Sequence, residues 1–261
     1  MNRNNEGRYL YSVLNRGIEA EFAEAGVNGA RVYTVVYRDL TAVVHACSDR
    51  PETADGEDEA MEWILEHIRV VDLTTEKFGT VVPFAFGTII KGDDEVVSEW
   101  LGENYAALKA ELSRFEGKAE YSVQIFYEQE LLSGEILKKN PGLQAQKEKL
   151  TGIPRGTAYL FERRLEQKIA EETEALISGL AAEYEARIRD CSDSVHSEEK
   201  KPRVPEEYKQ KKLFVFLACL VQDSKVQELG ELLDRINERE GICVRFIGPF
   251  APYSFVSLEG I

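Results

Sequence analysis

The chain has 261 residues, of which 43% are hydrophobic and 30% are charged, which is typical of a globular protein with its own core. Its net charge of −15 argues against a general nucleic-acid-binding protein, because neutralising phosphates requires a basic surface. The chain starts without the apolar core of a signal peptide and has no apolar run near the roughly 20 residues of a membrane span. We therefore expect a cytoplasmic protein that does not enter a membrane.

The first fifth of the chain carries strand and hairpin patterns. Aromatic and β-branched residues over 8–14 predict a strand. Residues 18–25 predict a short amphipathic helix that ends at Gly26. Two apolar runs, Val32 to Tyr37 and Thr41 to Ala46, predict an antiparallel hairpin because only a short polar segment separates them.

An acidic segment over 49–59 predicts an exposed loop that leads into a helix over 57–78. The residues of this helix that we expect to face the core are Met61, Ile64, Leu65, Ile68 and Val71. Residues 80–90 (TVVPFAFGTII) predict a strand that Pro83 and Gly87 interrupt, so an edge or a bulge is expected there.

A second apolar stripe predicts a helix over 94–115, which ends before Gly117 and leads to a strand over 120–128. We place a domain boundary near Gly117. The first predicted domain is therefore an N-terminal α+β domain over 1–117.

The second half predicts a long helix over 157–190 and a mobile loop over 191–211, where Pro202 and Pro205 lie among Ser, Glu and Lys. A strand over 212–221, a helix that begins at Asp223 or Ser224, and a strand over 242–250 follow. This order indicates a modified ferredoxin-like domain over 118–261 with a long helical insertion. The predicted fold class is α+β with two domains.

The histidines and cysteines give few signs of chemistry. The cysteines form no CxxC pair, and they are Cys47, Cys191, Cys219 and Cys243. His45 and Cys47 supply half of a zinc site, and no second pair at ligand spacing follows, so a strand-end histidine beside a buried thiol is the favoured interpretation. His196 falls in the predicted loop and is expected in solvent.

His67 is the most reactive candidate, because it lies on the predicted helix beside Glu66 and one turn after Trp63. General acid–base catalysis requires a second titratable group in a cleft, and the sequence identifies none. Nucleotide-binding, nucleophile-elbow and zinc-protease motifs are absent from the sequence. We therefore predict no catalytic, cofactor-binding or metal-binding residues, and the alternative is an enzyme or a ligand-sensing module with a site near His67.

Three charged or glycine-rich segments have ordinary interpretations beside functional ones. TGIPRG over 151–156 precedes a helix and is either a loop with a cap or an anion cradle. The acidic run 55–59 lacks the ligand spacing of a calcium loop. Lys209, Lys211 and Lys212 flank a strand, either as solubilising residues or as a docking patch for an acidic partner.

Several stretches, in the right order, resemble the gas vesicle protein F/L family (GvpF/GvpL). YLYSVL (9–14) is similar to the family's first strand, and VVYRDLTAVVHAC (35–47) to its hairpin. VVPFAFGTII (81–90) resembles its Leu-Pro-x-Arg-Phe-Gly-Thr motif, and GTAYL (156–160) its Gly-x-x-Tyr-Leu helix start. GPFAPYSFV (248–256) resembles its Gly-Pro-Trp-Pro-Pro-Tyr-Ser-Phe-Val ending, and His67 falls where the family carries a helix histidine.

Two departures from the family pattern concern single positions. Ala85 stands where the family motif has arginine, and Phe250-Ala251 stand where it has Trp-Pro. Both changes keep the stretches apolar, so the expected fold is unaffected. Any function tied to that arginine is in doubt for this chain.

The resemblance implies a two-domain α+β protein without catalytic activity or cofactor, which serves as a minor or accessory protein of gas vesicle assembly. Its implied partners are the small hydrophobic shell protein and other gas vesicle accessory proteins, and its implied location is the cytoplasm, in association with the vesicle. Because proline-interrupted apolar strands can dock a partner, we take as candidate contact residues Phe84, Phe86, Phe250 and Tyr253.

Overall fold

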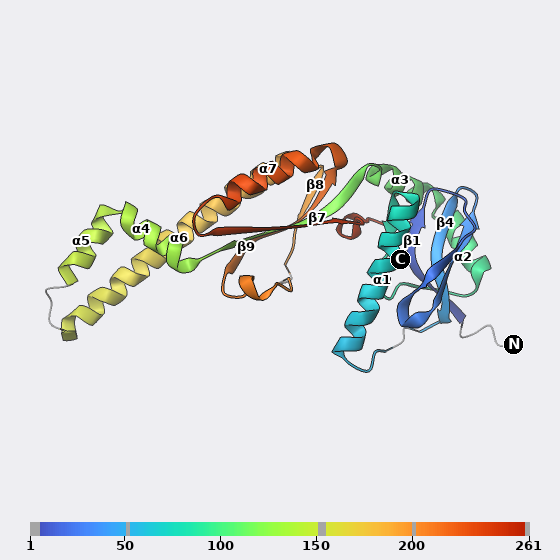
Figure 1. Cartoon of the computed structure of the whole chain (residues 1–261), viewed down its shortest axis with the longest axis horizontal. Helices are drawn as coiled ribbons and strands as arrows, with labels where there is room; N and C mark the ends of the chain where they lie inside the picture. Colours follow the sequence, from blue (N-terminus) through green and yellow to red (C-terminus); the bar gives the residue numbers. More distant parts are fainter. Residues whose placement is uncertain (1–5, 51–52, 151–154, 200–201, 259–261) are drawn as a thin grey trace. The chain divides into compact units, whose positions relative to one another are not determined.

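The computed structural model describes residues 6–50, 53–150, 155–199 and 202–258. The chain divides into two units, one formed by Met1–Glu120 together with Pro249–Ile261 and one by Tyr121–Gly248 (Figure 1). We call them unit 1 and unit 2. This division differs from the predicted domains 1–117 and 118–261 chiefly in the last segment, which the sequence analysis assigns to the second domain.

Unit 1 is built on a six-stranded sheet in which β1 is central. In sheet order the strands are β2 (Glu21–Ala25), β3 (Arg31–Tyr37), β4 (Leu40–Ser48), β1 (Glu6–Leu14) and β5 (Val81–Pro83), and β6 (Ile89–Lys91) also pairs with β1. All of the described pairings in this sheet are antiparallel. The predicted hairpin is confirmed as β3 and β4, and the predicted interruption of 80–90 is confirmed as the gap between β5 and β6.

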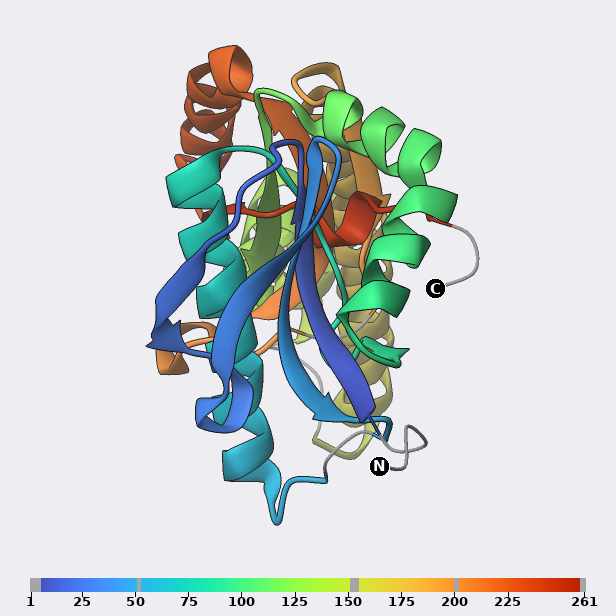
Figure 2. The same ribbon diagram turned by 90° about the vertical axis from the view of Figure 1, so that its right-hand side faces the viewer.

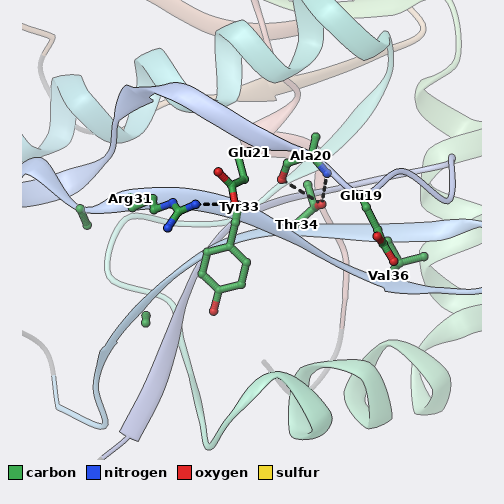
Figure 3. Close-up of a pocket in the computed structure, with 9 residues that line it drawn as sticks. Glu19, Ala20, Glu21, Arg31, Tyr33, Thr34 and Val36 are labelled. Atoms are coloured by element: carbon green, nitrogen blue, oxygen red, sulfur yellow. Dashed lines mark hydrogen bonds and ion pairs between the residues drawn. The ribbon is translucent and has the colours of Figure 1, made fainter.

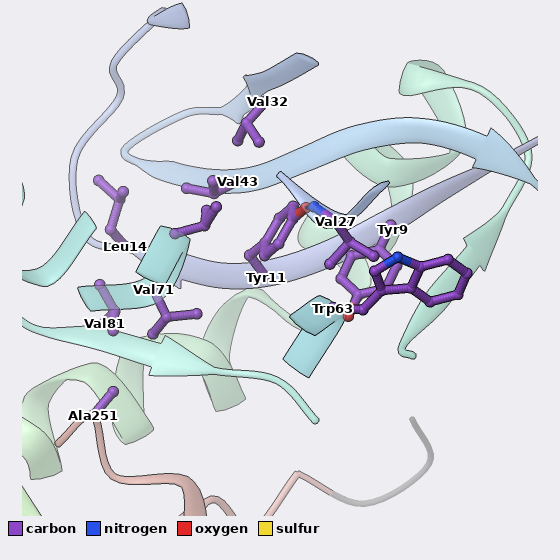
Figure 4. Close-up of a cluster of buried hydrophobic side chains, with 11 residues drawn as sticks. Tyr9, Tyr11, Leu14, Val27, Val32, Val43, Trp63, Val71, Val81 and Ala251 are labelled. Carbon is purple, nitrogen blue, oxygen red and sulfur yellow. Dashed lines mark hydrogen bonds between the residues drawn. The ribbon is translucent and has the colours of Figure 1, made fainter. Parts of the chain in front are cut away.

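Helices cover both faces of this sheet (Figure 2). Helix α1 (Glu57–Phe78) lies on one face, and α2 (Asp94–Glu103) and α3 (Tyr105–Phe115) lie on the other. Consequently β1 is buried along its length after its first residue, as expected for a strand that is covered on both sides. Figure 4 shows the core beneath α1, where Tyr9, Tyr11 and Trp63 lie among valines.

The predicted helix over 18–25 is wrong, because Glu21–Ala25 forms the edge strand β2. Its backbone pairs with β3, with Glu21 opposite Tyr33. The Thr34 hydroxyl also accepts a hydrogen bond from the Ala20 N–H at 2.8 Å. Local helix propensity is worth only a few tenths of a kcal/mol per residue, so available strand pairing overrides it.

The predicted limits of α1 are confirmed, and of its predicted core-facing residues Val71 is buried, Met61, Ile64 and Ile68 are half-buried, and Leu65 is exposed. Leu65 is 54% exposed, whereas the buried side chains of the helix are Trp63, His67, Val70, Val71 and Thr74. The predicted helix over 94–115 is two helices that meet at Asn104, whose side-chain amide donates to the Trp100 carbonyl at 2.9 Å.

Unit 2 contains a four-stranded sheet with the order β10-β7-β9-β8. The strands are β7 (Lys118–Tyr127), β8 (Ser194–Ser197), β9 (Lys212–Gln222) and β10 (Ile242–Phe250). Helix α7 (Val226–Asn237) buries the leucines 229, 232 and 233 together with Ile236. The predicted loop over 191–211 is therefore wrong in part, because Ser194–Ser197 pairs antiparallel with Leu217–Leu220.

Between β7 and β8 the chain forms three helices, α4 (Gln129–Lys139), α5 (Pro141–Leu150) and α6 (Arg155–Asp190). The C-terminal half of α6 packs against β9 and α7, whereas its N-terminal half lies beside α4 and α5, away from the sheet (Figure 1). We call α4, α5 and the N-terminal half of α6 the helical arm.

Candidate functional site

Five residues between β5 and β6, which we call the 84–88 loop, are attached to β1 at both ends. The Phe84 N–H donates to the Tyr11 carbonyl, and the Leu10 N–H donates to the Thr88 carbonyl, both at 2.9 Å. Gly87 has φ +86°, a conformation that residues with a side chain adopt only at a cost. The loop is therefore a defined turn, and Gly87 is favoured in it because the backbone has a positive φ at this position.

His67 of α1 connects the same loop to β1. Its Nε2 lies 3.0 Å from the Phe84 carbonyl, which can only accept, so Nε2 carries the proton and donates. Its Nδ1 then accepts from the Tyr9 hydroxyl at 2.9 Å, while the Tyr9 oxygen accepts from the Gly87 N–H at 3.0 Å. Burial lowers the pKa of His67 to about 4, so the ring is neutral at pH 7.

The hydrogen bonds of His67 give no support to the alternative interpretation, an enzyme or a ligand-sensing module with a site near this residue. Both ring nitrogens are engaged in hydrogen bonds within the protein, and a general base needs one of them directed at a substrate. The geometry instead gives His67 a positioning role, because it fixes the backbone on either side of Ala85 and Phe86.

A second tyrosine–histidine pair lies beside the first. The Tyr11 hydroxyl accepts from the Val27 N–H at 2.9 Å, so its proton is directed to His45 Nδ1 at 2.8 Å. The rings of Tyr9 and His45 are stacked, with centroids 4.8 Å apart. Burial raises the pKa of Tyr9 to about 12, so this hydroxyl stays protonated as a donor.

An exposed aromatic side chain lies at the surface of this region. Phe86 is 41% exposed, and its ring lies edge-on to those of Tyr9 and His67 at 6.2 and 6.0 Å between centroids. A cavity of about 130 Å³ opens beside it, with Trp63 and Cys47 among its lining residues. Phe86 is therefore an exposed apolar side chain beside a hollow of mixed lining, which also includes Asn28, His45 and Arg50.

The four predicted contact residues fall in different places. Phe86 and Tyr253 both lie about His67, the Tyr253 ring at 6.2 Å between centroids. Phe250 is 36% exposed at the end of β10. Phe84 is only 5% exposed and packs edge-on against Trp100 at 5.8 Å, so it is a core residue and does not reach the surface.

The C-terminal segment is fastened to unit 1 by polar contacts that sequence reasoning missed. Glu120 accepts from the backbone N–H and the hydroxyl of Ser254, at 2.8 and 2.7 Å. Arg114 donates to the Phe255 carbonyl and to Glu111, and Glu111 accepts from the Ser257 hydroxyl at 3.1 Å. Except for Arg114 and Glu111, which are neighbours on α3, these partners are more than 100 residues apart in the chain, so no local pattern could have indicated them.

A larger cleft of about 770 Å³ lies at the sheet edge formed by β2 and β3 (Figure 3). Part of its polar lining is engaged in contacts that join this edge. Arg31 forms an ion pair with Glu21, and the Thr34 hydroxyl accepts from the Ala20 N–H at 2.8 Å and donates to the Ile18 carbonyl at 2.9 Å. These contacts fasten the segment of β2 to β3.

The remaining candidates have structural roles. Lys209 pairs with Glu206 and Lys211 with Glu128, as expected for residues that flank a strand. The acidic run 55–59 supplies the first turn of α1, where negative charge is favourable. His196 lies on β8, and residues 151–154 of the predicted anion cradle lie outside the described residues. Within the described ranges, no group of three or more His, Cys, Asp or Glu side chains could hold a metal ion.

Comparison with solved structures shows which known proteins have a similar fold. The chain is similar to the crystal structure of the gas vesicle protein GvpF from Anabaena sp. PCC7120, with a TM-score of 0.73 and 17% identity over 98% of this chain and all of that one. The GvpF structure from Microcystis aeruginosa matches with a TM-score of 0.65 and 16% identity, over 97% of this chain and 99% of that one. The mixed α and β architecture with antiparallel pairing is thus that of GvpF structures.

Sequence comparison gives the family. Gas vesicle protein L2 of Halobacterium salinarum is 29% identical over 96% of this chain and 91% of its own length. Gas vesicle protein F of Haloferax mediterranei is 26% identical over 96% and 93%. The family model for the gas vesicle synthesis protein GvpL/GvpF matches residues 7–257. The chain belongs to the GvpL/GvpF family and takes part in gas vesicle formation, and no described helix has the length and hydropathy needed to span a membrane.

Proposed function

We propose that this chain is an accessory protein that binds the small hydrophobic shell protein of the gas vesicle and assists its assembly. A shell subunit with one apolar face must be kept from aggregating before it is incorporated. A partner that covers this face needs apolar side chains that stay exposed because the backbone that carries them is fixed.

The observation that carries this proposal is Phe86, which is 41% exposed although it is the middle residue of the fixed 84–88 loop. The Tyr9–His67 pair holds the backbone on both sides of it. Because the ring is pre-positioned, a partner loses little of its binding energy in ordering this surface. The adjoining cavity of about 130 Å³ can receive an apolar side chain, as at the centres of protein interfaces.

Ala85 extends the apolar character of this surface. It is exposed at the position where the family motif has arginine, so position 85 carries no cation, and Arg50 is a cation that lines the adjoining cavity. The Tyr253 ring packs against His67, and Phe250 is a second exposed aromatic residue of unit 1.

The test is the affinity of the full-length chain for the shell protein of the same organism, comparing Phe86→Asp with Leu65→Asp. Leu65 is a matched control because it is also an exposed apolar residue of unit 1, at 54%, but lies on α1 outside the loop. We expect at least about tenfold weaker binding for Phe86→Asp and little change for Leu65→Asp. Equal retention by both folded variants would contradict the proposed site, and no binding by the wild-type chain would contradict shell-protein binding itself.

The proposal includes a location on the gas vesicle in the cytoplasm, with other gas vesicle accessory proteins as further partners. It also includes a modified ferredoxin-like fold for unit 2. Two features support that class: the order strand, helices, strand, strand, helix, strand along the chain, and the sheet order β10-β7-β9-β8. In that description the helical arm is the insertion.

A further inference from the structure

The end of the helical arm exposes three consecutive apolar side chains. Tyr159, Leu160 and Phe161 of α6 are 57%, 64% and 46% exposed. Successive helical residues are about 100° apart around the axis, so these three cover more than half of the helix circumference. A core-facing helix has a single apolar stripe, so most of this surface is not explained by packing within unit 2.

An apolar groove leads away from these residues along the arm. It has a volume of about 500 Å³, and its apolar lining residues are Leu137, Leu150, Leu165 and Ile169. Helix α5, which forms one side, has ten residues and is therefore about 15 Å long. This length suits a helix of a few turns lying in the groove.

The charge at the end of the arm contrasts with that of the chain. Residues 138–168 contain eight Lys and Arg and three Glu, whereas residues 129–172 contain eight and seven, and the whole chain has a net charge of −15. Two of these glutamates, Glu162 and Glu166, line the groove with Lys147. Arg163 lies over the Tyr159 ring, with the guanidinium carbon 5.8 Å from the centroid. The excess of positive charge is therefore a property of the end of the arm, where Arg163 lies directly at the exposed aromatic surface.

From these observations we propose that the end of the helical arm is a second docking surface, whose occupant is an acidic amphipathic helix of another protein. The apolar stripe of that helix covers Leu160, Phe161 and the groove, and its carboxylates face Lys147, Lys149, Arg163 and Arg164. Charge decides against a symmetric pairing of two arms, because two basic ends would repel each other. This surface lies in unit 2 and is independent of shell-protein binding through Phe86.

The test uses the full-length chain and a designed helical peptide of about 18 residues, with Leu at i, i+4 and i+7 spacing, Glu at a few of the other positions and Ala at the rest, because too many like charges would unfold the helix. A second peptide has the same leucines and Lys in place of Glu. Fluorescence anisotropy gives Kd for each. We expect the acidic peptide to bind at least about tenfold more tightly than the basic one, with weaker binding at high salt.

Variants locate the binding. Leu160→Ser with Phe161→Ser should weaken binding of the acidic peptide at least about tenfold. Leu131→Ser is the matched control, since Leu131 is a 41% exposed leucine at the start of α4. Lys149→Glu with Arg163→Glu should weaken binding and flatten its salt dependence, and Arg187→Glu at the far end of α6 should do neither. Unchanged circular dichroism establishes that the variants fold.

Three results would overturn the proposal. One is equal binding of the two peptides, or binding that the arm variants leave unchanged. Another is self-association of the wild-type chain in light scattering that Leu160→Ser with Phe161→Ser abolishes, which would make a second copy the occupant. The third is co-sedimentation with phosphatidylglycerol vesicles that depends on the same residues, without peptide binding, which would make a lipid surface the occupant.

Discussion

Unit 1 and the helical arm of unit 2 both expose aromatic side chains, but they support them differently. Phe86 lies on a short turn that Tyr9, His67 and β1 hold by hydrogen bonds. Tyr159, Leu160 and Phe161 lie in the N-terminal half of the long helix α6, the half that lies beside α4 and α5. The first surface is fixed by a buried network, and the second by the stiffness of a helix. The backbone that carries an exposed aromatic residue can therefore be fixed either by buried hydrogen bonds or by the helix that contains it.

The largest expected difference between the two regions is in how much stability the protein loses when a phenylalanine is truncated to alanine. Phe115→Ala removes a side chain with no solvent exposure from unit 1, and it should lower the free energy of unfolding by about 3–5 kcal/mol. Phe161→Ala in the arm should change it by no more than about 0.5 kcal/mol. Urea denaturation of both variants measures this, and a comparable loss in both would show that the arm is packed more tightly than its exposure indicates.

The next effect is a pH dependence confined to unit 1. The folded protein keeps His67 neutral down to its pKa of about 4, whereas the unfolded chain binds that proton near pH 6.5. Stability from this group is therefore complete above pH 6.5 and falls by about 3 kcal/mol as the pH drops to 4. His67→Gln should be less stable at pH 7 and should lack this part of the slope. Parallel stability curves for wild type and variant would rule out the buried neutral ring.

A smaller effect concerns the turn that carries Phe86. Gly87→Ala should destabilise the protein by about 1–2 kcal/mol, because φ +86° strains any residue with a Cβ although no atom lies within 4 Å of the new methyl group. Gly56→Ala is the control, since Gly56 is extended at φ −173° and also has open space. Thermal denaturation should separate the two variants, and identical shifts would mean that the turn is not strained.

The smallest effect has the opposite sign and lies in unit 2. Gly179 is an exposed glycine inside α6, and a Cβ there would meet nothing within 4 Å. Gly179→Ala should raise the free energy of unfolding by about 0.5–1 kcal/mol, because alanine loses less backbone entropy in a helix. Denaturation at pH 7 checks the sign. A loss of stability would indicate that α6 needs a flexible point at this position.

The predicted interruption of 80–90 is present as the gap between β5 and β6, whereas the contact role of its residues stays a prediction. Phe86 is exposed, as a contact residue must be. The role of His67 could not be read from the sequence, because its partners Tyr9, Phe84 and Gly87 come from other elements. Phe84 and Phe86 have the same residue type and nearly the same position, and only the direction of the backbone buries one and exposes the other.

The sequence by itself determined the elements whose pattern is strong and local: the β3–β4 hairpin, the limits of α1 at Glu57 and Phe78, and the long helix α6. In these segments the period of the apolar residues and the position of glycines agree with one structure. Tertiary structure alone decided that 21–25 is a strand, that Trp63 and not Leu65 faces the core, and that the last residues belong to unit 1. The physical reason is that weak local preferences yield to strand pairing, burial and polar contacts, and these depend on partners far away in the chain.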